Sequence, residues 1–227
     1  PYLSIYKRDY ASNPANAMAA LWLAAGSERK AAGNLTEGDD KPASAAELAL
    51  YRQYLADPQA QLAPSLEASD RLYQAAVLAK DTASQQAELE RAWQLLQKNP
   101  NAPAALKPRM NYLAARARTL LDQPLVDRYR AITITAPLKD SIARKQAGLQ
   151  QVLASQQQIL DLKVAEFVTQ AQFINGDSYG GFYQGVLKAP APAGMNELEP
   201  EQYQIEIEEQ TQPLKDKAIE WHKADTT

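Results

Sequence analysis

Apolar residues recur at helical spacing along most of this 227-residue chain, and this period limits the fold more than any other feature. In the segment that follows Pro14, the recurring positions are Met18, Leu21, Trp22 and Ala25. A spacing of 3.6 residues is typical of an amphipathic helix. The chain has nine glycines, and its one β-branched run is residues 132–135, so the composition gives little support to strands. The sequence therefore predicts an all-α protein.

Proline, glycine and capping residues divide this pattern into about eight or nine helices. We expect a short helix opened by Ser44, an acidic helix and a final helix divided or kinked at Pro213, and further helices at residues 14–32, 65–80, 82–98, 104–121, 138–160 and 164–187. Ser44 with Glu47, and Thr82 with Gln85, have the spacing of a capping box. Helices joined by short polar connections pack as antiparallel hairpins. The expected architecture is an α-solenoid of such hairpins.

Other stretches interrupt the helical pattern. Residues 1–13 are mixed and predict a ragged lead-in, and residues 33–42 form a polar loop with Gly and Pro. Pro124 should end the helix before it, because proline cannot donate the next helical hydrogen bond. In residues 125–137, DRYRAI is typical of a helix and ITITAP of an extended segment.

Charge and composition exclude several classes of function. A net charge of −3, from 24 basic and 27 acidic residues, gives no concentrated basic face for nucleic acid. The densest basic patch, at residues 116–130, is diluted by Asp122 and Asp127. No apolar run approaches the ~20 residues of a membrane span. The chain has no Cys and begins PYLSIYKRDY, with neither an initiator Met nor a signal peptide, so we expect an excised domain or a processed chain.

The sequence offers no arrangement of catalytic or metal-binding residues. His222 is the only histidine, and it stands among Lys and Glu near the chain end, where a solvated or packing role is expected. Zinc would need several His or Cys ligands. The acidic run at residues 197–209 lacks the Asp/Asn/Gly rhythm of a calcium loop, and GDSYGG (residues 176–181) lacks the Lys of a phosphate loop. We predict a non-enzyme without cofactor or metal.

Four glycines lie close together within one helical pattern, at Gly176, Gly180, Gly181 and Gly185. The pairs 176/180 and 181/185 are each four residues apart, which leaves a strip without side chains where another helix can approach. Because each Gly costs a helix up to ~1 kcal/mol relative to Ala, four in ten residues imply a compensating contact. The alternative is that GDSYGG is a loop that splits two shorter helices.

Two segments fit a 34-residue helix-turn-helix repeat. Setting its terminal proline at Pro100 brings Ala76 and Ala92 to contact positions, although Glu88 occupies a place for a small apolar residue. In the second segment Gly176 takes the small position of the first helix, and Ala218 the close-contact position of the partner helix. Roughly one extra helix lies between them, so this unit resembles an expanded tetratricopeptide repeat.

The resemblance becomes specific in residues 137–222. PLKDSIARKQAGLQQVL, AQFINGDSYGGFYQGVL and the run from Pro190 to His222 resemble a pattern of bacterial cell-envelope tetratricopeptide-repeat proteins. Met195, Asn175 and Thr211 depart from it. Such proteins are typically periplasmic or outer-membrane-associated, and are often linked to Tol/Ton-like motor complexes. The resemblance implies a protein-binding scaffold in the periplasm whose partner is a peptide or protein, such as a subunit of such a complex, with no nucleic acid and no membrane span.

We expect degenerate repeats in residues 1–123 and the expanded repeat in residues 124–227, as one continuous solenoid with a concave binding surface. In such repeats, first-helix residues at fixed offsets line the groove. The expected partner-binding residues are Asp70, Tyr73, Val77, Lys80, Gln170, Phe173 and Asp177. Two alternatives stay open, a helical accessory domain of a peptidoglycan-acting enzyme whose catalytic part lies outside this chain, and a structural spacer.

Overall fold

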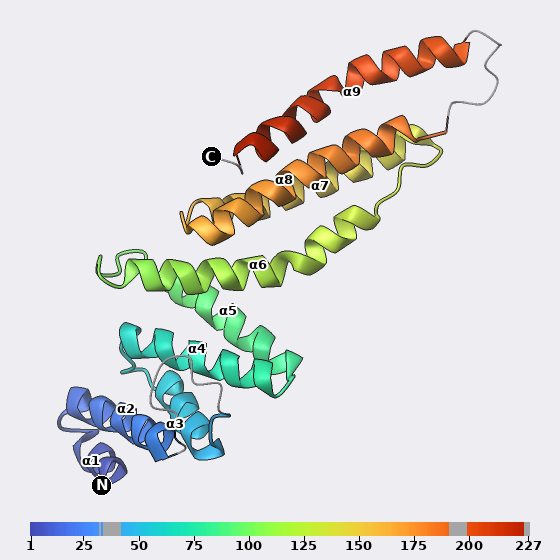
Figure 1. The fold of residues 1–227 in the computed structure, drawn as a ribbon. Helices are drawn as coiled ribbons and strands as arrows, with labels where there is room; N and C mark the ends of the chain where they lie inside the picture. The colour runs from blue at the N-terminus through green and yellow to red at the C-terminus, as the bar shows by residue number, and fades with distance from the viewer. Residues whose placement is uncertain (32, 34–41, 191–198, 225–227) are drawn as a thin grey trace. The chain divides into compact units, whose positions relative to one another are not determined.

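The computed structural model describes residues 1–31, 33, 42–190 and 199–224. The described residues form nine α-helices and no strand (Figure 1), so the all-α prediction is confirmed. The helices are α1 Tyr2–Asp9, α2 Pro14–Ala31, α3 Ala45–Ala56, α4 Leu62–Leu78, α5 Thr82–Lys98, α6 Lys107–Ala131, α7 Leu138–Leu160, α8 Ala165–Leu187 and α9 Glu199–Ala224. The chain separates into two compact units, Pro1–Ala117 and Arg118–Thr227, so both this boundary and the one we expected after residue 123 lie within α6. Most of the polar loop expected at residues 33–42, and most of the break that begins at Pro190, lie outside the described residues.

Helix caps explain where α3 and α5 begin. The Ser44 hydroxyl accepts the Glu47 backbone N–H at 3.0 Å, which is the first half of the expected capping box. The Glu47 side chain does not return to Ser44. It is buried and accepts a hydrogen bond from Arg71 of α4. For α5 we expected Thr82 as the cap, and this prediction is wrong by one residue. Asp81 is the N-cap, and its carboxylate accepts the Ser84 N–H at 3.1 Å.

Two prolines lie inside helices, which corrects the expectation that they end or divide them. Pro124 lies within α6 and Pro213 within α9. Each proline deprives the carbonyl four residues earlier of its helical N–H partner. These carbonyls belong to Leu120 and Glu209, and both residues are exposed, so water can replace the lost donor. Residues 1–13 also differ from expectation, because they contain helix α1.

In the first unit the helix pairs with extensive contacts are consecutive in sequence: α1 with α2, α2 with α3, α3 with α4, and α4 with α5. This nearest-neighbour pattern is the one that stacked helical hairpins produce. Met18 and Leu21 pack on Tyr54 in one cluster, and Ala25 packs with Tyr51 and Leu72 in the next. The helical period of residues 65–80 predicts that Ala79 faces inward, but it is the C-cap of α4 and is exposed.

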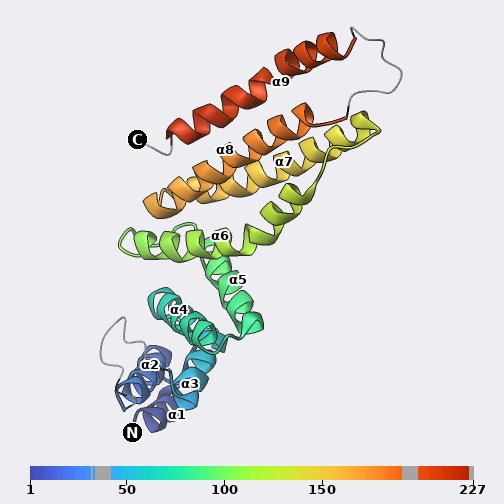
Figure 2. The ribbon, with the colours of Figure 1, turned by 45° about the vertical axis from the view of Figure 1, so that its right-hand side comes forward.

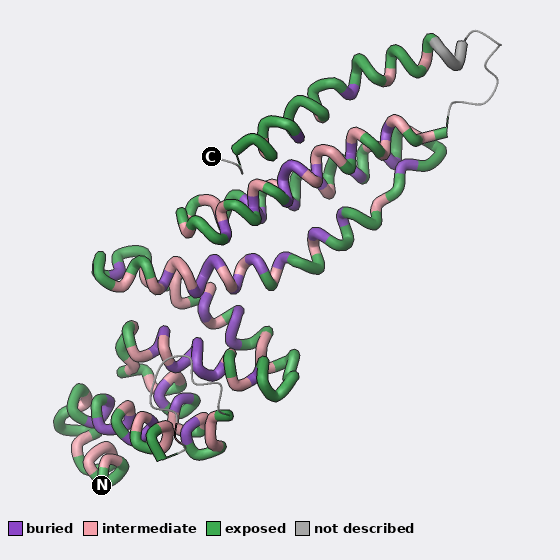
Figure 3. Tube along the Cα trace, viewed as in Figure 1, coloured by how far each residue is buried: buried purple, intermediate pink, exposed green. Residues whose placement is uncertain are grey.

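In the second unit α8 packs against both α7 and α9, and the three helices run alongside one another (Figure 2). The helical period of residues 164–187 predicts one buried stripe, and the structure confirms that its members are buried: Phe167, Ala171, Ile174, Ser178 and Phe182. Buried residues gather on α7 and α8, whereas α9 is largely exposed (Figure 3). The helical period of residues 104–121 predicts that Leu120 of α6 faces inward, but this residue is 44% exposed.

The four glycines lie within the continuous helix α8, so the alternative that GDSYGG is a loop is wrong. A Cβ at Gly176 would lie 2.7 Å from His222 Cε1, and one at Gly180 would lie 3.8 Å from Ala218 Cβ. These two glycines therefore form the expected strip for close approach, and α9 is the helix that occupies it. A Cβ at Gly181 would meet nothing within 4 Å. The absence of a side chain at Gly181 is therefore not what allows a neighbouring helix to approach.

Candidate functional site

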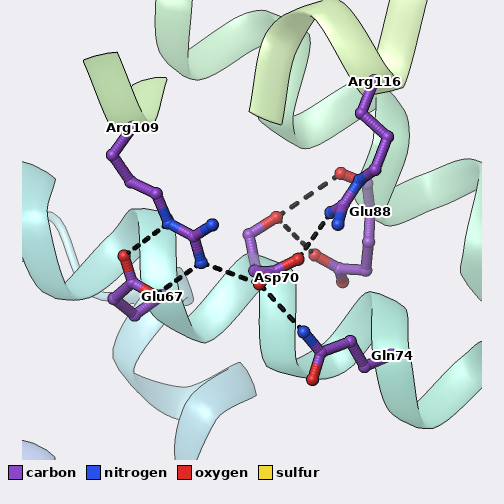
Figure 4. A network of polar contacts seen from close by, with 7 residues as sticks. Glu67, Asp70, Gln74, Glu88, Arg109 and Arg116 are labelled. Carbon is purple, nitrogen blue, oxygen red and sulfur yellow. Dashed lines mark hydrogen bonds and ion pairs between the residues drawn. The ribbon is translucent and has the colours of Figure 1, made fainter. Parts of the chain in front are cut away.

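Asp70, the first expected groove residue, is 6% exposed and sits at the centre of a cluster of charged side chains. One of its carboxylate oxygens accepts Arg116 Nη2 at 2.5 Å, and the other accepts Arg109 Nη2 at 2.8 Å. Arg109 also forms two hydrogen bonds with Glu67, at 2.9 and 2.8 Å, and the hydrogen bond with Glu67 raises the pKa of Arg109. Figure 4 shows Asp70 of α4 pointing between the two α6 arginines. Asp70 thus binds the first half of α6 rather than lining an open groove.

The other expected groove residues of the first unit lie around the end of α4. Tyr73 is half-buried, with the Arg116 guanidinium carbon 4.5 Å from its ring centroid. Val77 is 44% exposed. Lys80 has φ 55° and donates its N–H to the Val77 carbonyl, while the next N–H bonds the Ala76 carbonyl. These bonds form a Schellman motif, so Lys80 is the turn residue that ends α4.

A second charged pair, between α3 and α4, is more deeply buried than the pairs formed by Asp70. Arg71 Nε donates to Glu47 Oε1 at 3.0 Å, and both residues are buried, Glu47 completely. Arg71 also lines a cavity of about 340 Å³ in the first unit. Its lining residues are Trp22, Arg29, Tyr51, Glu67, Asp70, Arg71, Gln74 and Arg109. We call it the arginine cavity.

Glu88, which departs from the repeat at a small apolar position, is 8% exposed. Its Oε2 accepts the Ser69 hydroxyl of α4 at 3.1 Å and Arg91 Nε at 3.0 Å. A polar pairing therefore replaces the apolar contact of the repeat. Such pairing satisfies a buried carboxylate that would otherwise be costly.

The expected groove residues of the second unit are more accessible. Gln170 is exposed, and Phe173 is 50% exposed. Asp177 is half-buried and accepts Arg130 Nη2 at 2.9 Å, in an ion pair at the surface. The three residues lie on α8 at spacings of three and four, which places them on one face of that helix.

Phe173 is part of an aromatic surface shared by α8 and α9. Its ring centroid lies 5.6 Å from that of His222, with the planes tilted by 59°. The imidazole rests over Gly176, where no side chain opposes it. Ile219, one turn before His222, is 43% exposed. We call Phe173, His222 and Ile219 the Phe173 surface; His222 has the packing role that we expected.

Buried polar groups in the second unit hold helices together. Lys145 of α7 donates to the Tyr129 and Ile132 carbonyls, at 2.9 and 3.0 Å, near the end of α6. Burial lowers the pKa of this lysine. The Tyr129 hydroxyl donates to the Ser178 carbonyl at 2.7 Å. All of these bonds satisfy backbone carbonyls, so we assign Lys145 and Tyr129 a structural role.

Sequence reasoning missed Arg71, Arg109 and Arg116 as partners of buried carboxylates. Charged residues at helical spacing predict a solvated face, and Arg116 was placed in a dilute surface patch. The one available signal was Asp70 and Arg71 side by side among apolar positions. Neither residue could be paired without the fold.

Within the described residues no group of three or more His, Cys, Asp or Glu side chains could hold a metal ion. Nor does a helix in that part of the chain combine the length and apolar character needed to cross a membrane. No protein-family model, curated protein or solved structure matches this chain. The resemblance in residues 137–222 therefore stays a prediction.

Proposed function

We propose that this chain is a non-catalytic scaffold that binds a peptide or protein partner on its helical surface. The observation that carries the proposal is the Phe173 surface. A phenylalanine ring half exposed on a helix and in contact with an imidazole, with an exposed isoleucine one turn before that imidazole on α9, presents apolar area that a partner could cover.

Such a ring can contribute substantially to binding. Removing apolar surface from water contributes roughly 25 cal/mol per Å², and aromatic residues that become buried in interfaces are often the ones whose truncation costs ~2 kcal/mol or more. The contact with His222 holds the Phe173 ring in place before binding. A ring that is already ordered loses little side-chain entropy on association.

A location in the periplasm, with a partner among the subunits of a Tol/Ton-like motor complex, forms part of this proposal. It is supported by the sequence resemblance of residues 137–222. Val77 and Leu78, exposed at the end of α4, supply a further apolar contact in the first unit.

A cross-linked pull-down from bacterial envelope extract, read by mass spectrometry, tests the proposal. The parent chain is compared with Phe173→Ala and with Leu120→Ala, which removes a similarly exposed apolar side chain from α6. We expect the parent and Leu120→Ala to capture the same partner, including motor-complex subunits, and Phe173→Ala to lose it with unchanged helicity. Equal capture by all three chains, or no capture, contradicts the proposal. Loss of helicity in Phe173→Ala would show that this ring belongs to the core.

A further inference from the structure

A groove of about 360 Å³ in the second unit lies between α8 and residues 132–134, which follow the end of α6. On α8 it is lined by Gly181, Gln184 and Gly185. A glycine within a helix costs up to ~1 kcal/mol relative to alanine, yet a Cβ at Gly181 would meet nothing within 4 Å. No contact in the described chain accounts for this glycine. An open position beside a groove suits close approach by a second backbone.

Residues 132–134 are extended and lie beside α8. Burial alternates along them, because Ile132 is half-buried, Thr133 is exposed and Ile134 is buried in the core of this unit. A period of two residues is typical of extended backbone, and Figure 2 shows the connection between α6 and α7 as a drawn-out trace without helical turns. Ile134 Cδ1 lies 3.4 Å from the place of a Cβ at Gly185. The segment therefore forms one wall of the groove.

Both ends of this extended segment are anchored, but its middle is not. Lys145 Nζ donates to the Ile132 carbonyl at 3.0 Å, and the Ser141 hydroxyl accepts the Thr135 N–H at 3.1 Å. Between these anchors, the backbone N–H and C=O groups of residues 133–134 have no hydrogen-bond partner within the described chain. Unused backbone groups on an ordered, extended segment can pair with a strand from another chain.

The charged side chains that line the groove are all cationic. They are Arg130, Lys145 and Lys188, and none of its lining residues in the described chain is acidic. Arg130 is paired with Asp177, and Lys145 is bound to backbone carbonyls. Lys188 is exposed and forms no ion pair with another described residue. An acidic side chain complements this groove, whereas a basic one would be repelled.

We propose that this groove binds an extended acidic segment of a protein partner. The segment passes over Gly181, pairs its backbone with residues 133–134 and places an Asp or Glu beside Lys188. A small residue of the segment faces α8, where the open space depends on the missing side chain at position 181. The groove shares no residue with the Phe173 surface, so this binding goes beyond the scaffold function proposed above.

NMR titration of the parent chain with the synthetic peptide acetyl-Val-Ala-Val-Asp-amide tests the proposal. We expect the amide signals of residues 133–134 to shift and their hydrogen exchange to slow. A strand presents alternate N–H groups to one edge. Of two N-methylated peptides that block alternate amides, one should therefore bind about tenfold more weakly and the other like the unmodified peptide. No shift at residues 133–134, or the same affinity for both methylated peptides, would overturn the proposal.

A pair of matched glycine variants locates the binding. Gly181→Gln fills the groove, and Gly26→Gln makes the same change in α2 of the first unit, where a Cβ also meets nothing within 4 Å. Both should keep the helicity of the parent, since glutamine favours a helix over glycine. We expect Gly181→Gln alone to weaken the peptide about tenfold or more. Parent-like binding by Gly181→Gln, or loss of its helicity, contradicts an open groove at this position.

The charge preference is tested with a second peptide in which Asn replaces Asp. Lys188→Gln should weaken the Asp peptide roughly two- to fivefold, as expected for an exposed ion pair, and leave the Asn peptide unchanged. Equal binding of the two peptides by the parent would contradict an acidic partner. Phe173→Ala should bind the Asp peptide like the parent, so failure of the Phe173 surface and failure of the groove are distinguishable.

Sedimentation of the parent chain alone separates a protein partner from a second copy of this chain. We expect a monomer over the concentrations of the titration. Self-association that Gly181→Gln abolishes and Gly26→Gln retains would assign the groove to a second copy and overturn the proposal.

Discussion

The packing of His222 on Gly176 predicts that two glycines of the same helix respond differently to substitution. Gly176→Ala would place a Cβ 2.7–2.9 Å from three atoms of the imidazole, whereas a Cβ at Gly181 meets nothing within 4 Å. Distances below about 3.0 Å require the ring to move. His222 is exposed, so it can rotate away, but it then leaves the Phe173 ring.

The magnitudes follow from two opposing contributions. Alanine in place of glycine within a helix stabilises by up to ~1 kcal/mol, so Gly181→Ala should raise the free energy of unfolding by about that amount. Gly176→Ala gains the same but loses the contact between the imidazole and Phe173, of the order of ~0.5–1.5 kcal/mol for a ring pair. Its net effect should be near zero. In a His222→Ala background this loss is absent, and Gly176→Ala should then stabilise like Gly181→Ala.

Urea unfolding followed by circular dichroism measures these differences as a double-mutant cycle. We expect a coupling of roughly 0.5–1.5 kcal/mol between residues 176 and 222, and none between residues 181 and 222. Equal stabilisation by Gly176→Ala and Gly181→Ala in the parent background would refute the placement of the imidazole over Gly176. A deficit of Gly176→Ala that persists without His222 would show that another group limits the space.

Three further predictions concern buried charges and the end of α4. Arg71→Met should lower the free energy of unfolding by ~3–5 kcal/mol, because it leaves the buried Glu47 carboxylate without its partner. The double variant Glu47→Met/Arg71→Met should lose far less stability. Urea unfolding of both variants checks this, and equal losses would contradict it. Burial raises the pKa of Asp122 above its ordinary value of 3.8, so the folded state binds more protons than the unfolded state between those two pKa values. The parent should therefore gain stability relative to Asp122→Asn as pH falls from neutral toward 3.8, and a difference in melting temperature that stays constant with pH would be inconsistent with a raised pKa. Lys80→Gly should stabilise by ~1 kcal/mol, since Lys80 holds a left-handed conformation that glycine adopts without strain; a lower melting temperature would contradict this.

Apolar periodicity predicted most of the helices because each one buries a stripe against its neighbour. The bounds expected for α7 match the structure, and the α8 stripe from Phe167 to Phe182 is buried as predicted. The periodicity could not place α1, which has no fully buried residue. The helix ends predicted from Pro124 and Pro213 were wrong. A helix tolerates an internal proline when the carbonyl that loses its hydrogen bond can reach water, and this depends on the fold.

The candidate sites were less predictable. Helical offsets placed Phe173 at an exposed position, where the structure also places it, but the same offsets selected Asp70, which is buried among arginines. Offsets indicate which face of a helix a residue occupies and not what covers that face. Arg109 and Arg116 approach Asp70 from α6, about forty residues further along the chain, and no local pattern records that pairing.

Photo-cross-linking from position 173 tests recognition through the Phe173 surface most directly. p-Benzoylphenylalanine would replace Phe173 in one chain and Leu120 in another, and both would be irradiated in envelope extract. We predict a discrete protein adduct from position 173 that is absent from position 120 and competed by excess parent chain. No adduct from position 173, or the same adducts from both positions, would contradict the account.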